Sequence, residues 1–469
     1  MKYSAVSQAD QDRVEEEERR LQWIPSFRKP LFYLSLVCLW IVVFFAPLLA
    51  EHYDFITAKS HASIPSYSHL ATHCASVSSI PASEFQQRQQ TLAEMLHALN
   101  ASAYIAEPGA SALYYGNISG SAWHLSERPL LLLVTPEIAR PSEGAAEVRP
   151  KISVLTPAFE ATRAKLLPVP AEQVSYPEWP EDVNPYEVAV SAISSLVPEG
   201  KIYVDGAIRH FIVDGLQKAA PKARVLNAPV EIRELRERKS QRELEIMKCA
   251  NEVTVLAIRA VRARLFEGIR ESEASGYMHD ALAAAGLQDL FYLVLFGENA
   301  ALPHGSGTDR ILGKHDFVLI DCGGSLHSYQ SDVTRTFLLD DSSVNDEKMA
   351  LWNTIKAAQA YALQTARAGV LTRVVDQAAR DVISEGANVQ YFTHRLGHGI
   401  GLEGHESPYL VGGSNDIIQI GHTFSDEPGI YIEGKVGVRL EDCFYINNDG
   451  EAVYLTQGVG GPARNPWSP

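Results

Sequence analysis

Residues 317–339 hold the most constraining pattern in the sequence, two apolar runs that flank a glycine-rich turn and read as a β-hairpin. Each run carries an aspartate, Asp321 in the first and Asp332 in the second. If the turn is centred between Leu326 and His327, the two aspartates face each other across the strands. Opposed carboxylates repel unless a cation lies between them. Taken alone, the pair fits two solvent-facing acids on an edge hairpin equally well.

More metal-binding side chains follow the hairpin. The segment HRLGHGIGLEGHESP places three histidines within twelve residues, and two glutamates follow in FSDEPGIYI and GVRLEDCFYI. Carboxylates and imidazoles suit Mn²⁺, Co²⁺ or Zn²⁺, whereas a thiolate site would need paired cysteines. The pattern therefore predicts a site with room for two ions, built from one imidazole and four carboxylates. The carboxylates are Asp321, Asp332, Glu427 and Glu441, and the imidazole is that of His394, His398 or His405.

Six motifs in this order resemble one known family. They are LPHGSG, IDCGG, SDVTRTF, GHGIGLEGHE, DEPGIY and RLED, and they lie between residues 240 and 460. Together they resemble the "pita-bread" metallopeptidases, which include methionine aminopeptidase, aminopeptidase P, prolidase and creatinase. The resemblance implies an α+β catalytic domain over residues 239–469.

The resemblance also assigns metal-binding roles residue by residue. It implies that Asp321 holds one metal ion and that Asp332 bridges two. His398 completes one side, while Glu427 and Glu441 close the other side or bridge. Two divalent cations are expected, Mn²⁺ before Co²⁺ or Zn²⁺.

Other residues receive roles around the metal ions. By resemblance, His304 and His405 contact the substrate and stabilise the tetrahedral intermediate. Arg439 and Tyr431 are expected in the second shell. His394 matches a residue that lines the substrate pocket in prolidases, and a second-shell or packing role is equally compatible with the sequence.

The resemblance implies hydrolysis of Xaa-Pro peptide bonds, and we expect a dinuclear metal-bound hydroxide as the nucleophile, with Glu427 as the base. The GHGIGLEGHE run and the short spacing from Glu427 to Glu441 resemble those of compact microbial prolidases, which favours a dipeptidase over an aminopeptidase P. A homodimer is also expected by resemblance. Alternatives are creatinase-like amidine hydrolysis or a metal-dependent lyase on the same scaffold. An inactive binding protein is a weaker alternative because all five ligands are retained, and a purely structural membrane-tethered protein is weaker still.

The preceding residues, 81–238, predict an α/β domain. Short apolar runs at 103–106, 130–134 and 202–204 indicate strands separated by helices. Capping boxes are expected at Ser83 with Gln86 and at Ser240 with Glu243, the second opening the catalytic domain. By length and pattern, this half is similar to the creatinase-type N-terminal domain found in aminopeptidase P and prolidase.

Residues 31–50 form an uncharged apolar run of 20 residues, the length of a membrane-spanning helix. More basic residues precede the run than follow it, which predicts a cytosolic tail (1–30) and a linker (51–80) leading to a lumenal or extracellular catalytic part. A core helix or a signal peptide is the alternative. Sequons at Asn100 and Asn117 agree with a glycoprotein.

Composition excludes one class of partner. The formal net charge of −16 repels nucleic acid, which is not expected as a partner. The five cysteines are scattered and odd in number, so they do not indicate a disulfide framework. Two of them, Cys322 and Cys443, lie beside the expected metal ligands and are interpreted as packing residues.

Overall fold

A computed structural model describes residues 66–139, 147–305, 308–386 and 388–469. Tyr67–Pro469 form one compact unit. Two stretches of this unit are called the N-terminal lobe (residues 82–238) and the C-terminal lobe (residues 239–469) below. The domain boundary predicted at 238/239 stays a prediction, because both lobes belong to the one unit.

The N-terminal lobe is built on a sheet in which the strands follow the order β4-β3-β2-β1-β6-β7, with β5 beside β3. The three predicted apolar runs form β1, β2 and β6, as expected. The strands are β1 (Ala101–Ala106), β2 (Leu131–Ala139), β3 (Glu147–Pro157), β4 (Val174–Ser175), β5 (Glu178–Trp179), β6 (Lys201–Val204) and β7 (Arg224–Asn227). The helices are α3 (Ala82–Ala98), α4 (Ala110–Gly116), α5 (Ala161–Ala164), α6 (Pro185–Ser191), α7 (His210–Ala219) and α8 (Val230–Glu237).

Both faces of this sheet are buried by helices. Successive side chains of a strand point to opposite faces, and β1 shows the consequence. Tyr104 packs in a core with Leu96 of α3, while the next residue, Ile105, packs in a second core with Leu216 of α7. The predicted α/β lobe is therefore a layer of strands between two layers of helices.

The C-terminal lobe contains three sheets among the described residues. One joins β8 (Gln288–Phe296), β9 (Val318–Leu326), β10 (Tyr329–Gln330) and β11 (Val333–Phe337). The second has the order β13-β12-β14-β17-β18, and the third pairs β15 with β16. Their bounds are β12 (Gly397–Gly399), β13 (Glu406–Leu410), β14 (Thr423–Asp426), β15 (Gly429–Ile432), β16 (Val436–Arg439), β17 (Asp442–Ile446) and β18 (Ala452–Tyr454).

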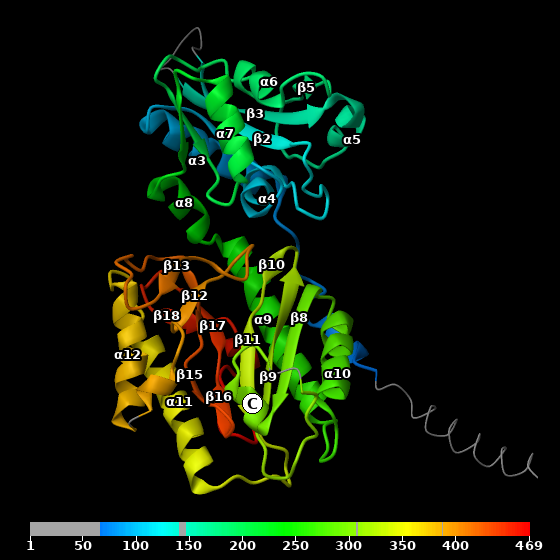
Figure 1. Ribbon diagram of the computed structural model, residues 1–469, viewed down its shortest axis with the longest axis vertical. Helices are drawn as coiled ribbons and strands as arrows, with labels where there is room; N and C mark the ends of the chain where they lie inside the picture. Colours follow the sequence, from blue (N-terminus) through cyan, green and yellow to red (C-terminus); the bar gives the residue numbers. More distant parts are fainter. Residues whose placement is uncertain (1–65, 140–146, 306–307, 387) are drawn as a thin grey trace, which may run out of the picture. The chain divides into compact units, whose positions relative to one another are not determined.

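Four long helices flank these strands. They are α9 (Gln241–Arg262), α10 (Glu271–Ala284), α11 (Asp346–Thr365) and α12 (Thr372–Glu385). In Figure 1, α11 and α12 lie on one flank of the strands and α10 lies on the other. The capping box of Ser240 and Glu243 opens α9 as predicted. The one predicted at Ser83 is wrong, because α3 begins at Ala82 and Pro81 occupies its N-cap position.

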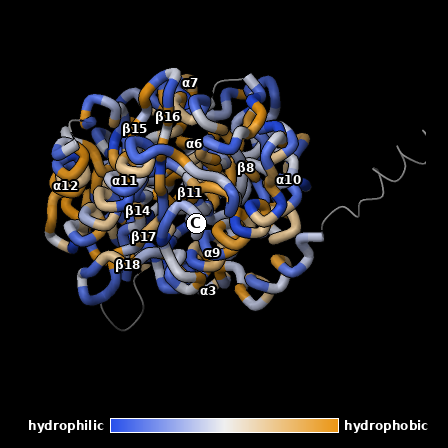
Figure 2. Tube along the Cα trace, turned by 90° about the horizontal axis from the view of Figure 1, so that it is seen from below, coloured by the Kyte–Doolittle hydropathy of each residue, from blue (hydrophilic) through white to orange (hydrophobic). Residues whose placement is uncertain are grey.

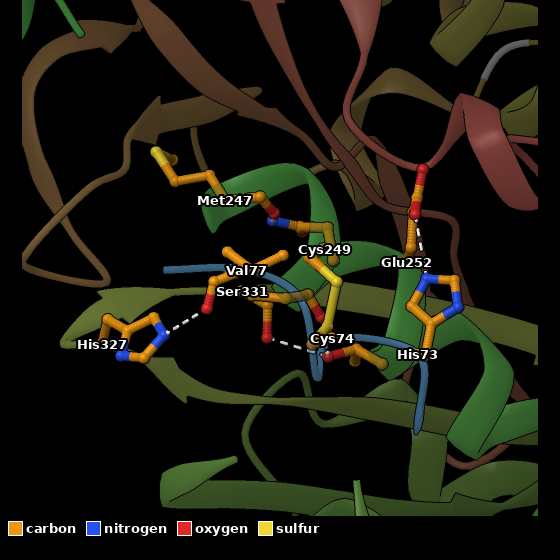
Figure 3. The surroundings of a disulfide bond; sticks show 11 residues. His73, Cys74, Val77, Met247, Cys249, Glu252, His327 and Ser331 are labelled. Carbon is orange, nitrogen blue, oxygen red and sulfur yellow. Dashed lines mark hydrogen bonds and ion pairs between the residues drawn. A yellow bond between two sulfur atoms is a disulfide. The ribbon is translucent and has the colours of Figure 1, made fainter. Parts of the chain in front are cut away.

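A disulfide joins Cys74 to Cys249 of α9 (Figure 3), which the sequence did not predict. Cys74 belongs to a strap, residues 67–80, that packs on the C-terminal lobe. His73 Nε2 lies 2.9 Å from the Glu252 carboxylate on the same helix. The cysteines are 175 residues apart in sequence, so only the fold brings them together. Cys322 and Cys443 are free and buried, in agreement with a packing role.

The predicted membrane helix requires a correction. No helix in the described part of the chain is long and apolar enough to cross a membrane. Along the described chain, hydrophobic and hydrophilic residues alternate over short stretches (Figure 2), as expected when only one side of each helix is buried. The absence of such a helix among the described residues contradicts the predicted single-pass helix and the lumenal or extracellular location derived from it. Residues 31–50, on which that prediction rested, lie outside the described residues.

The two sequons lie at chain turns. Asn100 and Asn117 both have a positive φ, of 52° and 53°. Asn100 is exposed, whereas the Asn117 amide donates a hydrogen bond to the Pro168 carbonyl. The predicted glycosylation has no support beyond the exposure of Asn100.

Candidate active site

The hairpin that carries Asp321 and Asp332 forms as predicted but in a different register. Asp321 lies in β9, and Asp332 directly precedes β11. The residue opposite Asp321 is Thr334, two positions beyond the expected partner. A shift of two residues keeps every side chain on its face of the sheet. The two aspartates are therefore diagonal neighbours on one face instead of a directly opposed pair.

The turn explains the register. The strands are connected by His327 and Ser328, both in the left-handed region with φ of 48° and 71°. Two residues with positive φ match the twist of a tight hairpin. Glycine or asparagine normally occupies such positions, so the residue types at 327 and 328 do not mark the turn, and its centre lies one position beyond the predicted one. Gly323 instead allows close packing, since a Cβ there would lie 1.9 Å from the Ser331 carbonyl oxygen.

The five predicted ligands converge from five places in the C-terminal lobe. Three sets could hold a metal ion, with the ligand atoms of each set within 4.8 Å of one another. The sets are Asp321 with Asp332 and Glu441, His398 with Glu427 and Glu441, and Asp332 with His398 and His405. Shared members join the sets into one cluster. His398 Nε2 lies 3.3 Å from Glu427 Oε1 and 3.7 Å from Asp332 Oδ2.

The electrostatics of the cluster favour cations. Removal from water raises the pKa of Asp332 well above its ordinary value, and the charges of Asp321 and Glu427 raise it further. Burial raises the pKa of Glu441 well above its ordinary value, and the charges of Asp332, Glu427 and Asp321 raise it further. Burial also raises the pKa of Glu427, to about 7. Carboxylates held together in this way need a positive charge to stay ionised near neutral pH.

His398 is prepared to act as a ligand. Burial lowers its pKa to about 3, and neighbouring His405 contributes, so the imidazole is neutral at pH 7. Its Nδ1 lies 3.0 Å from the Gly399 carbonyl oxygen and must carry the proton to donate a hydrogen bond there. The lone pair is then on Nε2, which points at Glu427 and Asp332.

His304 and His405 lie at the exposed side of the site. His405 directly precedes β13, and its ring centroid is 4.0 Å from that of His398. Burial lowers the pKa of His405, and the nearby charges of Arg395 and His304 act in the same direction. His304 follows the short 3₁₀ helix Gly297–Ala301 and is exposed. Both histidines are thus accessible from solvent beside the buried ligands.

A hydrogen-bonded chain supports the cluster from behind. Arg439 donates from Nη2 to Asp321 Oδ2 at 2.6 Å and from Nη1 to the Tyr431 hydroxyl at 3.0 Å. Tyr431 lies 2.8 Å from His394 Nε2, and His394 Nδ1 lies 2.7 Å from the Arg395 carbonyl. Burial lowers the pKa of His394 to about 4, so its neutral ring accepts from Tyr431 and donates to that carbonyl. Both ring nitrogens of His394 are therefore engaged within the protein.

Four residues that hold the cluster in place were not predicted from the sequence. The Thr334 hydroxyl donates to Glu441 Oε2 at 2.6 Å, and buried Arg335 donates to the Glu441 carbonyl at 2.7 Å. Asn251 of α9 accepts from the backbone N–H of Asp332, and Ser425 donates to Glu427 Oε1. Thr334 and Arg335 lie within SDVTRTF and could have been found there. Asn251 gave no signal, because it lies far from Asp332 in sequence.

One atom in the cluster shows that divalent metal ions fit it. Asp321 Oδ1 is buried and has no hydrogen-bond partner among the described residues. A buried carboxylate oxygen without a partner is costly, unless a cation occupies the space it faces. An oxygen-rich donor set with one neutral imidazole suits Mn²⁺, Co²⁺ or Zn²⁺. The residues of this cluster therefore fit divalent metal ions.

Comparison with known proteins identifies the family. Residues 245–448 match the model of metallopeptidase family M24. The chain is 35% identical, over 95% of its own length and 96% of the relative's, to an uncharacterized peptidase of Schizosaccharomyces pombe. The protein belongs to metallopeptidase family M24, the pita-bread family.

Solved structures agree with this assignment. A dipeptidase from Mycobacterium ulcerans superposes with a TM-score of 0.71 at 27% identity, covering 81% of this chain and 97% of that one. A prolidase from Thermococcus sibiricus superposes with a TM-score of 0.68, also at 27% identity, covering 81% and 98%. The structural similarity therefore extends over both lobes of this chain.

Proposed function

We propose that this peptidase is a metal-dependent exopeptidase that hydrolyses Xaa-Pro bonds, with dipeptides as its preferred substrates. The observation that carries the proposal is the buried cluster of four carboxylates and one neutral imidazole, in which an oxygen of Asp321 lacks a protein partner. Two divalent cations, Mn²⁺ first, would be held by these five side chains. The similar dipeptidase and prolidase structures support the same class of substrate.

The metal ions would lower the pKa of a water molecule and polarise the scissile carbonyl. The protein side chains would supply proton transfer and hydrogen bonds. Glu427 would accept a proton from that water and pass it to the leaving nitrogen. His405 and His304, at the accessible side, would donate hydrogen bonds to charge developing on the substrate.

Arg395 supports the preference for dipeptides. Its positive charge contributes to lowering the pKa of both His398 and His405, so it lies close to the reacting groups. The guanidinium stacks on the Tyr409 ring at 4.8 Å and forms no ion pair with a described carboxylate. In a dipeptide the terminal carboxylate is one residue from the scissile bond. We propose that Arg395 binds that carboxylate, as a planar guanidinium does well.

A proline bond needs a dedicated enzyme on chemical grounds. The Xaa-Pro amide has no N–H, and proline restricts the residue before it. Peptidases that bind an extended backbone through its N–H groups therefore handle it poorly. Creatinase-like hydrolysis or a lyase reaction remains the alternative on the same scaffold.

The test is hydrolysis by the full chain, stripped of metal and reloaded with Mn²⁺, Co²⁺ or Zn²⁺. The substrates are Ala-Pro, Gly-Pro, Ala-Pro-Ala, Ala-Ala and creatine, with Asp332→Asn as the inactive control. We expect cleavage of Ala-Pro and Gly-Pro only with metal and only by the unmutated chain. Arg395→Met should raise KM for Ala-Pro more than for Ala-Pro amide, which lacks the carboxylate. Cleavage of Ala-Ala or creatine in preference to Ala-Pro would overturn the proposal.

A further inference from the structure

The loop that carries His405 is held by the segment that connects the two lobes. Arg236 and Glu237 end α8, and Lys239 lies between α8 and α9. Each contacts a residue close to His405. Arg236 Nη2 lies 2.5 Å from Glu403 Oε2, and the Ser407 hydroxyl donates to Glu237 Oε1. The contacts thus lie on both sides of His405 in the sequence.

The central contact is the ion pair of Lys239 with Glu406, the residue after His405. Lys239 Nζ lies 2.7 Å from Glu406 Oε1, and both side chains are only 2% exposed. The same ammonium donates to the carbonyls of Arg236 and Glu237 at 3.0 Å each. All three donors of the lysine are therefore used, which fixes its position. A buried pair of this kind holds its geometry because breaking it leaves an unpaired charge in the interior.

A glycine in the same loop makes room for this pair. A Cβ on Gly401 would lie 2.6 Å from Lys239 Cε and 2.7 Å from Glu406 Oε1. Glu406 also has a second oxygen, Oε2, that lacks a hydrogen bond and lies 3.8 Å from Arg236. The carboxylate is thus held between two cations of the lobe connection. Its main chain opens β13 directly after His405.

The His405 ring itself lacks such support. Among the described residues, no hydrogen bond holds its two nitrogens, and its described ring contact is with His398. Its position therefore depends on the backbone of the loop. His398, by contrast, is held through its own Nδ1.

We propose that the Lys239–Glu406 ion pair is a positioning device that fixes His405 for catalysis, so that the lobe connection is part of the active-site architecture. The proposal rests on the proposed function, in which His405 hydrogen-bonds to the reacting substrate. Lys239 and Glu406 are positioning residues that act through His405.

The experiment measures kcat and KM for Ala-Pro with Glu406→Gln, Lys239→Met and Gly401→Ala in the metal-loaded full chain. Each is made alone and combined with His405→Ala. Displacing a catalytic group costs about 10- to 100-fold in rate. We expect a fall of that size in kcat for the single variants, with KM within about threefold. In the His405→Ala background the same changes should lower kcat by less than about twofold, because the positioned group is absent.

Gly404→Ala is the matched control. It adds one methyl group directly before His405, where a Cβ meets no atom within 4 Å. We expect kcat of this variant to equal that of the unmutated chain. If Lys239→Met does not fold, as judged by its thermal unfolding, Gly401→Ala tests the pair with both charges retained. Multiplicative losses in the His405→Ala background would overturn the proposal.

A second readout needs no substrate, so it separates this proposal from the proposed function. In protein labelled with ¹³C-histidine, the His405 ring signal is assigned by its loss in His405→Ala. We expect this signal to shift or broaden in Glu406→Gln and Gly401→Ala but to stay unchanged in Gly404→Ala. An unchanged His405 signal in Glu406→Gln would overturn the positioning role, even if the enzyme cleaves Ala-Pro. Failure to cleave Xaa-Pro substrates, with the signal shifted as expected, would remove only the proposed substrate.

Discussion

The two lobes differ in what they bury. The sheet of the N-terminal lobe has apolar cores on both faces, with residues such as Ile105 and Leu132 fully buried. The C-terminal lobe also has large apolar cores, but its centre holds buried Asp332, His398 and Glu441. Apolar burial stabilises a fold directly, whereas clustered carboxylates destabilise it until a cation arrives. The N-terminal lobe is thus built for stability, whereas the C-terminal lobe gives up stability for a reactive site.

The largest effect should follow from changing the charged centre. Asp332→Asn removes a carboxylate shared by two of the possible metal sets. We expect kcat to fall by about 10³-fold or more, because the metal ions supply several kcal/mol of transition-state stabilisation. The metal-free variant should unfold at a higher temperature than the metal-free parent, since carboxylate repulsion is relieved. Steady-state kinetics and calorimetry check both, and Asp214→Asn in the N-terminal lobe, half exposed, serves as control.

A change in the N-terminal lobe should lower stability and leave activity unaffected. Leu132→Ala in β2 removes a fully buried side chain. We expect a loss of about 2–5 kcal/mol in the free energy of unfolding, from lost burial and the cavity left behind. The kcat per folded molecule should not change. Denaturant unfolding measures the loss, and Leu166→Ala, at a side chain 79% exposed, should be nearly neutral. A large fall in kcat for folded Leu132→Ala would break the proposed division between the lobes.

The disulfide links the strap to the C-terminal lobe, and the whole N-terminal lobe lies between the two cysteines in the sequence. Cys74→Ser opens a loop whose ends are 175 residues apart. We expect a loss of about 2–4 kcal/mol in the free energy of unfolding. Thermal unfolding with and without reductant provides the measurement: reductant should lower the unfolding temperature of the parent and leave that of Cys74→Ser unchanged. Equal sensitivity of both proteins would show that the bond contributes no stability.

The pH dependence of the metal-free protein should reveal the charged centre. Burial raises the pKa of Glu427 from 4.5 to about 7 in the folded state. Between these values the folded state binds a proton that the unfolded state has released, so stability falls as pH rises. The expected fall is roughly 2–3 kcal/mol between pH 4.5 and 7 from this group. Unfolding of metal-free protein across this range tests it, and Glu427→Gln should flatten the slope.

The smallest effect is expected behind the cluster. Tyr431→Phe removes the hydroxyl that links Arg439 to His394. We expect kcat to fall by roughly three- to tenfold, in line with about 1 kcal/mol for one hydrogen bond. Kinetics with Ala-Pro measures it. Tyr445→Phe, at a half-buried ring in β17, should leave kcat unchanged.

Much of the site could be predicted because its reactive side chains lie in short sequence motifs. All five expected ligands converge, since each lies in a short motif whose residue types reveal its use. The hairpin register could not be predicted, because the turn residues His327 and Ser328 have positive φ angles, which these residue types rarely adopt. The membrane helix predicted from the apolar run at residues 31–50 found no support in the described helices.

The sequence by itself determined the family, the residues that converge in the cluster and the alternation of strands and helices, because residue type and spacing along the chain encode them. Only the tertiary structure decided the pairing of Cys74 with Cys249, the support of Asp332 by Asn251 and the ion pair of Lys239 with Glu406. Each of these joins residues at least 81 positions apart. Contacts at such separations depend on how the elements pack, and packing is set by the whole core instead of by any local pattern.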